Sequence, residues 1–535
     1  DGYIDRASVD LYSFYAQGGY FADNTSVKFI TFGGKEKTYH AWNYASKEEM
    51  EKYGRRFNSC GMYTDDDGNI RFYKDQTDNY LQMNYQLLLN HTFSPEWNLN
   101  AALHYTKGDG YYQEYKEDRT LKEYRLPPFM HDGKEVDKSD LIRQKKMDNH
   151  FGGGVFSVNY QNGKLNASLG GALNHYDGWH FGRVIWVKNY IGELLPDHEY
   201  YRNKAKKTDG NLYLKANYNL VAGLNAYADL QYRYINYKIN GDHDKFDSNA
   251  DALQKLAVND HFNFFNPKAG LNWDIDANNR VYASFSIAQK EPTRNNYTDG
   301  NADEYPKAEK LLDYELGYTY RNTWLSAGAN FYYMDYKDQL VLTGELNEIG
   351  EAMARNVPDS YRMGMELMLS VKPCQWFQWD INATLSKNRV KNFTEKLYEG
   401  EWKNPIEVSH GNTPIAFSPD LILNNRFSFS YRGFEVALQS QYVSKQYMSN
   451  ARQADQTLDT YFVSNLNLAY TFKLPHVKSV TAGFTIYNLF NAEYENNGYA
   501  GSGYKIVKGE VERYNYAGYA AQAGTNVMGN ISIRF

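Results

Sequence analysis

The sequence predicts an all-β fold, a transmembrane antiparallel β-barrel of about 19 strands. Its 535 residues include 50 Tyr, 28 Phe and 9 Trp, yet the mean hydropathy is −0.71. Disordered chains are poor in aromatic residues, so the low hydropathy does not indicate an unfolded chain. A barrel explains both values, because alternate residues face lipid or a wet lumen and aromatic girdles mark the two membrane interfaces. No apolar stretch reaches the roughly 20 residues that a membrane-spanning helix needs.

Strict alternation of apolar and polar residues over about ten positions predicts the individual strands. In residues 97–106, Trp97, Leu99 and Leu103 share one face, and the other face is mostly polar. A soluble β-sandwich or propeller is the alternative, but its strands usually have about five or six residues. The same pattern predicts three hairpins: residues 212–220 with 224–234, 421–431 with 434–442, and 462–472 with 480–486.

The predicted connections alternate between short turns and long polar loops, as they do in outer-membrane barrels. The short turns are expected near Asp23, Ser94, Asn162, Gly223, Asp276, Asn322, Pro373, Gly433 and Pro475. The long loops are expected at residues 39–77, 116–144, 188–206, 241–259, 292–305, 342–352, 392–411, 448–456 and 495–519. The final strand ends on Phe535, which resembles the assembly signal of outer-membrane barrels.

The strand count predicts more chain than residues 1–535, which we interpret as one barrel domain. Bacterial single-chain barrels have an even number of strands, and 22 is a standard size for plugged ones. We therefore expect that an N-terminal plug and about three first strands are absent from this sequence. The sequence starts at Asp1 with neither Met nor a signal peptide. Three strands that start in the periplasm and run up, down and up would deliver the chain to the outside, where the first predicted strand begins.

Searches for catalytic patterns exclude the common enzyme classes. The sequence has no Walker loop and no H-E-x-x-H, G-x-S-x-G or C-x-x-C motif, so we expect neither an enzyme nor a resident metal or cofactor. The two cysteines, Cys60 and Cys374, are expected to be unpaired. A net charge of −6 without a basic face argues against nucleic acid as a partner. Residues 152–154, all Gly, are expected in a barrel wall, and residues 65–69 in a hairpin turn, with a calcium site as the alternative for the latter.

Five segments of the second half resemble the barrels of TonB-dependent receptors. Residues 283–293 are similar to the family's "SF…R.PT", residues 306–317 to "L.PE….YE.G" and residues 356–366 to "N…G.E", and residues 411–419 resemble the segment before the late hairpins. The most specific match is the near-terminal motif "NLF(N/D)..Y", which is carried by Asn488, Leu489, Phe490, Asn491 and Tyr494. The resemblance covers residues 279–535, and the loop style most resembles Bacteroidetes members.

The resemblance implies TonB-driven import across the bacterial outer membrane of a large, scarce nutrient. A ferric siderophore is the first expectation, and cobalamin or haem is the nearest alternative, so the transported ligand would carry iron or cobalt. SusC-like glycan import ranks behind these because such barrels are longer. A passive porin and an outer-membrane protease or lipase are the competitors from other classes. The implied partners are the TonB–ExbB–ExbD complex, acting through the plug, and outer-membrane lipid and lipopolysaccharide; a surface lipoprotein is left open.

Aromatic and cationic residues of the loops and upper lumen are the candidate ligand contacts. Flat rings can stack on catecholate, corrin or porphyrin groups, and Arg can pair with acidic groups. Packing of the interfacial girdle and loops is the competing interpretation for each residue, and haem ligation is a further one for a loop His. The candidates are His40, Trp42, Arg55, Arg56, Tyr111, Tyr112, Tyr115, Trp179, His180, Arg294 and Arg355.

Overall fold

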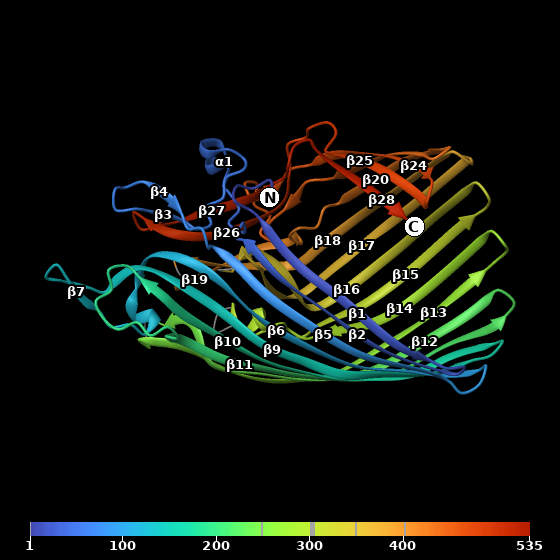
Figure 1. The fold of residues 1–535 in the computed structure, drawn as a ribbon, viewed down its shortest axis with the longest axis horizontal. Helices are drawn as coiled ribbons and strands as arrows, with labels where there is room; N and C mark the ends of the chain where they lie inside the picture. Colours follow the sequence, from blue (N-terminus) through green and yellow to red (C-terminus); the bar gives the residue numbers. More distant parts are fainter. Residues whose placement is uncertain (1, 248–249, 300–304, 348–349, 401–402) are drawn as a thin grey trace. The chain divides into compact units, whose positions relative to one another are not determined.

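The computed structural model describes residues 2–247, 250–299, 305–347, 350–400 and 403–535 (Figure 1). It confirms the predicted all-β antiparallel fold. The chain divides into two compact units. Unit 1 comprises Asp1–Asn43, Phe57–Tyr218 and Asp229–Asn266, and unit 2 comprises Tyr44–Arg56, Asn219–Ala228 and Pro267–Phe535.

Unit 1 is a meander in which each long strand pairs antiparallel with the next. Tight turns and long connections alternate along it. Its strands are β1 (Val9–Phe21), β2 (Thr25–Tyr39), β5 (Thr77–Thr92), β6 (Trp97–Thr120), β9 (Lys138–Gln161), β10 (Leu165–Val187) and β11 (Glu199–Val221). It also contains most of β12 (Leu224–Asp247) and the first part of β13 (Ala252–Asp274).

The long connections of unit 1 fold into small structures of their own. The hairpin β3–β4 (Met62–Thr64 and Ile70–Phe72) confirms the turn predicted at residues 65–69. In this turn the Asp65 carboxylate accepts hydrogen bonds from the backbone N–H groups of Asp67 and Asn69. A second hairpin, β7–β8 (Phe129–His131 and Lys134–Val136), follows the 3₁₀ helix η1 (Leu121–Tyr124).

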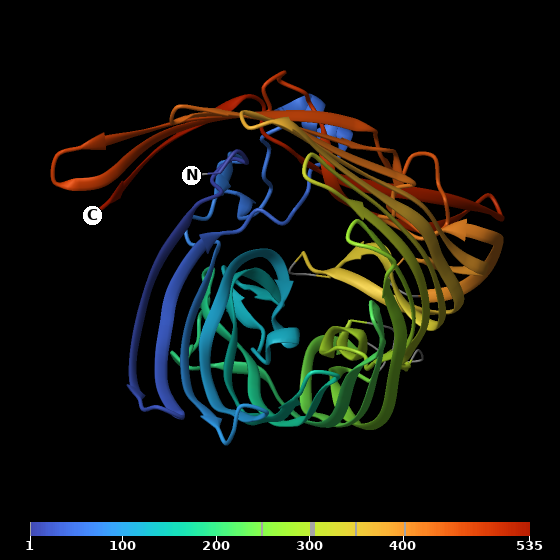
Figure 2. The same cartoon turned by 90° about the vertical axis from the view of Figure 1, so that its right-hand side faces the viewer.

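The segment around η1 fixes which face of the unit 1 strands is the inner one. In Figure 2 the cyan η1 lies on the concave side of the blue-to-green strands. Leu121 and Tyr124 pack there with Leu141 of β9 and Val184 of β10, and all four are buried. Residues that alternate with Leu141 and Val184 therefore point outwards.

Unit 2 continues the antiparallel pattern. Its strands are β14 (Asn279–Lys290), β15 (Glu309–Arg321), β16 (Leu325–Leu346), β17 (Ala352–Cys374), β18 (Phe377–Glu399), β19 (Lys403–Pro414), β20 (Leu421–Tyr431), β21 (Phe434–Val443), β24 (Tyr461–Leu474), β25 (Val477–Tyr487), β26 (Glu495–Val507), β27 (Glu510–Ala521) and β28 (Asn526–Arg534). The short strands β22 (Gln446–Tyr447) and β23 (Thr457–Leu458) pair with each other. The predicted hairpins β20–β21 and β24–β25 are confirmed.

Helices are few among the described residues. Helix α1 (Lys47–Tyr53) begins at a capping box formed by Ser46 and Glu49, and α2 (Arg294–Thr298) begins after Thr293. Neither is long or apolar enough to cross a membrane.

The predicted strand number agrees with the structure. The large sheet contains 22 strands in the described part of the chain. Strand β19 pairs with the loop end of β18, whose other end pairs with β20, and β26 and β27 form a hairpin while β25 pairs directly with β28. Without these three extensions, the predicted 19 strands remain.

The loops predicted at 39–77 and 448–456 have the boundaries that the structure shows, whereas six of the other predicted loops were too long. Strands β6 and β9 extend to Thr120 and from Lys138, inside the expected loop 116–144, and the expected loop 495–519 is largely β26 and β27. The turn expected at Pro373 falls just after Cys374 instead. A strand of 24 residues is roughly 80 Å long, whereas crossing a membrane takes about 9–11 residues. The strands therefore continue beyond the membrane, where the outer face is polar, the inner face mixes buried apolar and charged residues, and the apolar alternation is lost. The described segments thus revise the loops predicted at 188–206, 241–259, 342–352 and 392–411 as well; residues 300–304 of the loop 292–305 lie outside the described residues.

The three glycines at residues 152–154 lie in β9, as predicted. Gly153 is flanked by His104 and Asn174 on the neighbouring strands, and the imidazole Nε2 of His104 lies 2.8 Å from the Asn174 side-chain oxygen. A Cβ atom at Gly153 would lie 2.3 Å from that oxygen and 2.4 Å from the Leu173 carbonyl. The absent side chain therefore makes room for a hydrogen bond between β6 and β10.

We expect Gly153→Val to destabilise the protein by about 1–3 kcal/mol, because the clash includes backbone that cannot rotate away. Gly163→Val is the matched control, since nothing lies within 4 Å of a Cβ at that turn position. The fraction that stays folded on heating, measured by gel mobility, reports the difference. Equal thermal stability of the two variants would contradict this role of Gly153.

Candidate functional site

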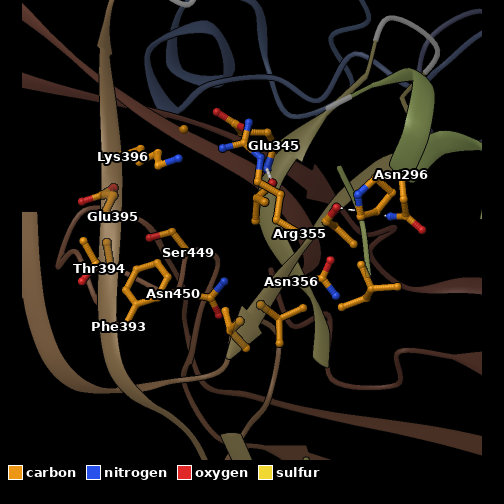
Figure 3. A pocket seen from close by; sticks show the side chains of 18 of the residues that line it. Asn296, Glu345, Arg355, Asn356, Phe393, Thr394, Glu395, Lys396, Ser449 and Asn450 are labelled. Atoms are coloured by element: carbon orange, nitrogen blue, oxygen red, sulfur yellow. Dashed lines mark hydrogen bonds and ion pairs between the residues drawn. The ribbon is translucent and has the colours of Figure 1, made fainter. Parts of the chain in front are cut away.

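A cavity of about 440 Å³ lies at the loop ends of the unit 2 strands (Figure 3). In Figure 3, Phe393, Glu395 and Lys396 stand on one side of it, and Arg355 and Asn356 face them from the other. Residues from β16, β17, β18, β26 and the segment 449–451 line it, together with Asn296 of α2.

Two residues with left-handed backbone direct side chains into this cavity. Asp338 in β16 has φ +49° and Asn392 in β18 has φ +49°. Asp and Asn tolerate this conformation better than most other residues. Each interrupts the alternation of its strand, so odd-numbered residues beyond it, such as Val341 and Phe393, face the cavity. Irregularities of this kind re-aim side chains next to functional sites.

The cavity combines an apolar wall with charged side chains. Val341, Val357, Val390 and Ile415 are buried together, and Phe393 packs against them. This cluster supports the base of the cavity with rigid, well-packed side chains. A flat or apolar part of a ligand could therefore pack against Phe393.

One ion pair at the rim is long and mostly buried. The Arg355 guanidinium lies 3.8 Å from the Glu345 carboxylate, and both side chains are about three-quarters buried. Burial raises the pKa of the Glu345 carboxyl, although the charge of Arg355 acts in the opposite direction. Glu345 lies about 20 residues from the tight turn that precedes β16, so it stands well beyond the membrane-crossing part of that strand.

The second acid of the cavity has strong partners. Glu395 accepts two hydrogen bonds from the Arg513 guanidinium, at 2.6 and 2.9 Å, and its carboxylate lies 2.8 Å from Nε2 of His410. A bidentate pair of this kind is geometrically specific. Glu395 is therefore held in one position, and its pair with Arg513 links β18 to β27.

In unit 1 the structure brings three predicted candidates together in one aromatic cluster. The rings of His40 and Trp42 stack at 3.7 Å, and Tyr112 packs edge-on against both at 6.1 and 5.9 Å. His40 is only 2% exposed. Burial lowers the pKa of His40 to about 4, although the charge of nearby Glu114 acts in the opposite direction. His40 is therefore neutral at physiological pH.

A buried ion pair lies beside this cluster. The Glu114 carboxylate accepts hydrogen bonds from Arg143 at 3.0 and 2.9 Å, and Arg143 also donates to the Tyr124 hydroxyl. Burial alone would raise the pKa of Glu114, but the charges of Arg143 and Lys116 hold it below its ordinary value. The pair ties the walls of β6 and β9 to the η1 segment.

The other candidates are spread over the two units. In unit 2, Arg55 pairs with Glu495 at 2.5 Å, Arg56 is exposed, and Arg294 is the first residue of α2. In unit 1, His180 lies on the inner face of β10. Tyr111, Tyr115 and Trp179 lie on the outer face of their strands, because they alternate with the inward residues of β6 and β10.

Phe393, Lys396 and Glu345 of the cavity were not predicted from the sequence. They lie on different strands, and their spacing along the chain has no pattern. Asp338 and Asn392, each isolated inside a long strand, are the sequence signal that could have indicated the position of the cavity.

The near-terminal motif has a structural explanation. Asn488 and Asn491 both have left-handed backbone, at φ +48° and +53°. The Asn488 amide donates to the carbonyls of Ala492 and Ala523, and the Thr525 hydroxyl donates to the Asn488 carbonyl. The motif thus turns the chain after β25 and anchors the start of β28. Phe535 ends the chain beside that strand and is 82% exposed.

Long antiparallel strands, exposed apolar residues on their outer faces and extended polar walls define an outer-membrane barrel protein. The chain belongs to the family described as TonB dependent receptor-like, beta-barrel, which matches residues 12–489. This family consists of transporters and receptors of the outer membrane that are coupled to TonB, and the protein is accordingly an outer-membrane protein.

Solved structures show the same fold at low sequence identity. The siderophore receptor PiuA from Acinetobacter baumannii is 12% identical, with a TM-score of 0.69, and the match covers 99% of this chain and 75% of that one. The ferric-catecholate import receptor Fiu from E. coli K12 is 10% identical, with a TM-score of 0.65, and the match covers 100% and 76%. The copper transporter OprC is 14% identical, with a TM-score of 0.64, and the match covers 92% and 67%. No curated protein sequence matches this chain.

The neutral, buried His40 predicts a pH-dependent loop. Its pKa is about 4 in the folded protein and about 6.5 when exposed, so the unfolded loop binds the proton first as pH falls. Stability of this loop is fully present above pH 6.5 and decreases by about 3 kcal/mol towards pH 4. The difference in fluorescence between the wild type and Trp42→Phe should report this transition.

His40→Phe is the control, because it keeps the ring stack but cannot bind a proton. The fluorescence transition between pH 6.5 and 4 should disappear in this variant. An unchanged transition would show that another group titrates.

Proposed function

We propose that this chain is the barrel of a TonB-dependent importer that binds a ferric siderophore at the cavity between Arg355 and Phe393. The observation that carries the proposal is the pairing of the apolar Phe393 ring with the Arg355 guanidinium on the inner face, beyond the membrane. Two of the structural neighbours are described as siderophore or ferric-catecholate receptors, which supports the same substrate class. Cobalamin and haem remain the competing ligands.

The charge arrangement favours a ligand that carries negative groups. Arg355 and Lys396 both line the cavity, and Glu345 competes with the ligand for Arg355. An acidic ligand that replaces Glu345 would form shorter, charge-assisted hydrogen bonds than the existing contact of 3.8 Å. We infer that ligand binding and the Glu345–Arg355 pair exclude each other.

The inner face at membrane height is suited to receive a plug. Tyr282 donates to Asn330 at 2.8 Å and lies 3.3 Å from Glu315, and the Asn330 amide lies 3.4 Å from Glu366. These carboxylates, with Asp313, form an acidic, hydrogen-bonded strip on β14–β17 of unit 2. We propose that a plug with complementary cations docks on this strip, and that TonB with ExbB and ExbD acts through that plug. Lipid and lipopolysaccharide would surround the outer face.

The substrate class is tested by calorimetry on the full-length receptor with ferric siderophores, haem and cyanocobalamin in parallel. We expect tight binding of a ferric siderophore, and roughly tenfold or greater loss in Arg355→Gln, since a hydrogen bond to a charged group contributes about 1.5–3 kcal/mol. Lys337→Gln is the matched control, because Lys337 lies on the same sheet but pairs with Asp359 outside the cavity. Binding of haem or cyanocobalamin alone would replace the siderophore proposal.

Binding of an acidic ligand should strengthen as pH falls through the pKa of Glu345. Protonated Glu345 no longer competes for Arg355, so more of the arginine is available to the ligand. In Glu345→Gln the affinity should be higher and independent of pH in this range. The same pH dependence in the variant would show that the ligand does not displace Glu345.

The plug proposal predicts that Glu315→Gln combined with Glu366→Gln weakens plug docking in the full-length receptor. Single-channel recordings in planar bilayers should then show larger or more frequent passive openings. Asp380→Asn is the control, because Asp380 pairs with Ser370 on the same sheet, away from the strip. Unchanged conductance would contradict docking at these carboxylates.

A further inference from the structure

The outer face of unit 1 changes from apolar to charged and aromatic along each strand. On β10, Leu169 and Leu173 point outwards and are 46% and 63% exposed. Continuing the same alternation, Trp179 and Phe181 lie on this outer face, opposite the η1 segment. These aromatic side chains therefore stand outside the barrel wall, away from the lumen.

Strand register places the neighbours of Trp179 in three successive rows across β6, β9, β10 and β11. Every residue in a row is directly opposite the next one, and all of them share the outer face. From the membrane outwards, the rows are Lys107, His150, Asp177 and Lys206; then Asp109, Asp148, Trp179 and Lys204; then Tyr111, Lys146, Phe181 and Arg202.

The apolar-to-charged boundary runs obliquely across these rows, as a membrane plane would. The apolar Leu81 of β5 pairs directly with the charged Asp109 of β6, so the apolar part of the outer face extends further along β5 than along β6. The row that contains the aromatic Tyr105 on β6 contains the polar His175 on β10, so the boundary shifts in the same direction between these strands. Barrel strands tilt by about 35–45° from the membrane normal, so a level surface must cross their register rows at such an angle. The rows around Trp179 therefore lie just above the hydrocarbon layer.

Two carboxylates in this region are each shared by two cations. Asp177 lies 2.8 Å from Lys204 and 3.6 Å from Lys206. Glu199 lies 3.3 Å from Arg183 and 2.6 Å from Arg202. Each trio has one positive charge more than it needs for pairing, so two excess positive charges face outwards.

Aromatic rings hold these cations in place. The Arg202 guanidinium lies 4.3 Å from the Phe181 ring centre and 5.1 Å from that of Trp179. The Lys204 ammonium lies 4.7 Å from the Trp179 ring centre. Such contacts restrict long side chains before any ligand arrives, which lowers the entropy cost of binding.

We propose that Arg183, Arg202, Lys204 and Lys206, arranged around Trp179 and Phe181, bind the phosphate groups of the outer-leaflet glycolipid, the lipid A part of lipopolysaccharide. Position, charge and chemistry agree: the patch lies at headgroup height, has excess positive charge, and offers the exposed ring of Trp179, against which a sugar can pack. The site depends on the outer-membrane location and not on which ligand is imported. Failure of the siderophore proposal would therefore leave it unaffected.

The test compares binding of purified full-length receptor to lipid A with two phosphates, to the same lipid after dephosphorylation, and to inorganic phosphate. We expect binding of the phosphorylated lipid and loss of roughly 30-fold in Arg202→Gln combined with Lys204→Gln, since each basic residue near a membrane surface contributes about fivefold. Lys215→Gln is the matched control, because Lys215 lies on β11 but on the opposite face from Lys204 and Lys206.

Asp177→Asn provides a variant that should gain affinity, because it frees two lysines without removing a cation. This gain keeps the proposal testable if the double variant folds poorly. Equal binding of the phosphorylated and dephosphorylated lipid would overturn the proposal. Inorganic phosphate binding as tightly as the lipid would overturn the assignment to a glycolipid headgroup.

Discussion

The backbone hydrogen-bond ladder between neighbouring strands is the constraint on which the rest of the structure depends. In hydrocarbon an unpaired N–H or C=O group costs several kcal/mol, so every strand that crosses the membrane must be fully paired along its length. Continuous pairing fixes the register, and register fixes which alternate residue points inwards. The acidic strip inside unit 2 and the lipid-facing leucines outside unit 1 both follow from that single requirement. Gly153 shows how tightly the ladder is packed. A side chain at this position would occupy the space of a hydrogen bond between β6 and β10.

Beyond the membrane the same ladder continues, but its purpose changes. Strands such as β6 and β9 are more than twice as long as a membrane crossing requires. Their extended walls are held by side-chain pairs such as Glu114 with Arg143 and Glu395 with Arg513. These pairs, together with the apolar clusters on the inner face, hold the walls in place beyond the membrane. The cavity beside Arg355 and the cluster around His40 are each mounted on such walls.

The sequence predicted what depends on local periodicity and missed what depends on distant neighbours. Alternation at residues 97–106 identified β6, and the tight turns and strand number followed from similar patterns. The ends of β6 and β9 were misplaced, because there the outer face is polar and the inner face mixes charged and apolar residues, so no apolar alternation reveals the strand. Phe393 and Arg355 come together only through the pairing of β16, β17 and β18, which spacing along the chain cannot show. Trp179 was predicted as a ligand contact of the loops or upper lumen, whereas the register of four strands places it on the outer face.

The left-handed residues Asp338 and Asn392 give the unit 2 strands two separately adjustable parts. On the membrane side of each residue, contact with lipid determines which alternate side chains point outwards. On the other side, the cavity determines which alternate side chains point inwards. An insertion or deletion of one residue above such a point would exchange the set of side chains that meets the ligand, while leaving every lipid-facing residue where it was. Related barrels could in this way acquire new specificities through a one-residue shift in the part of the strands beyond the membrane. Insertion into the membrane would not be affected.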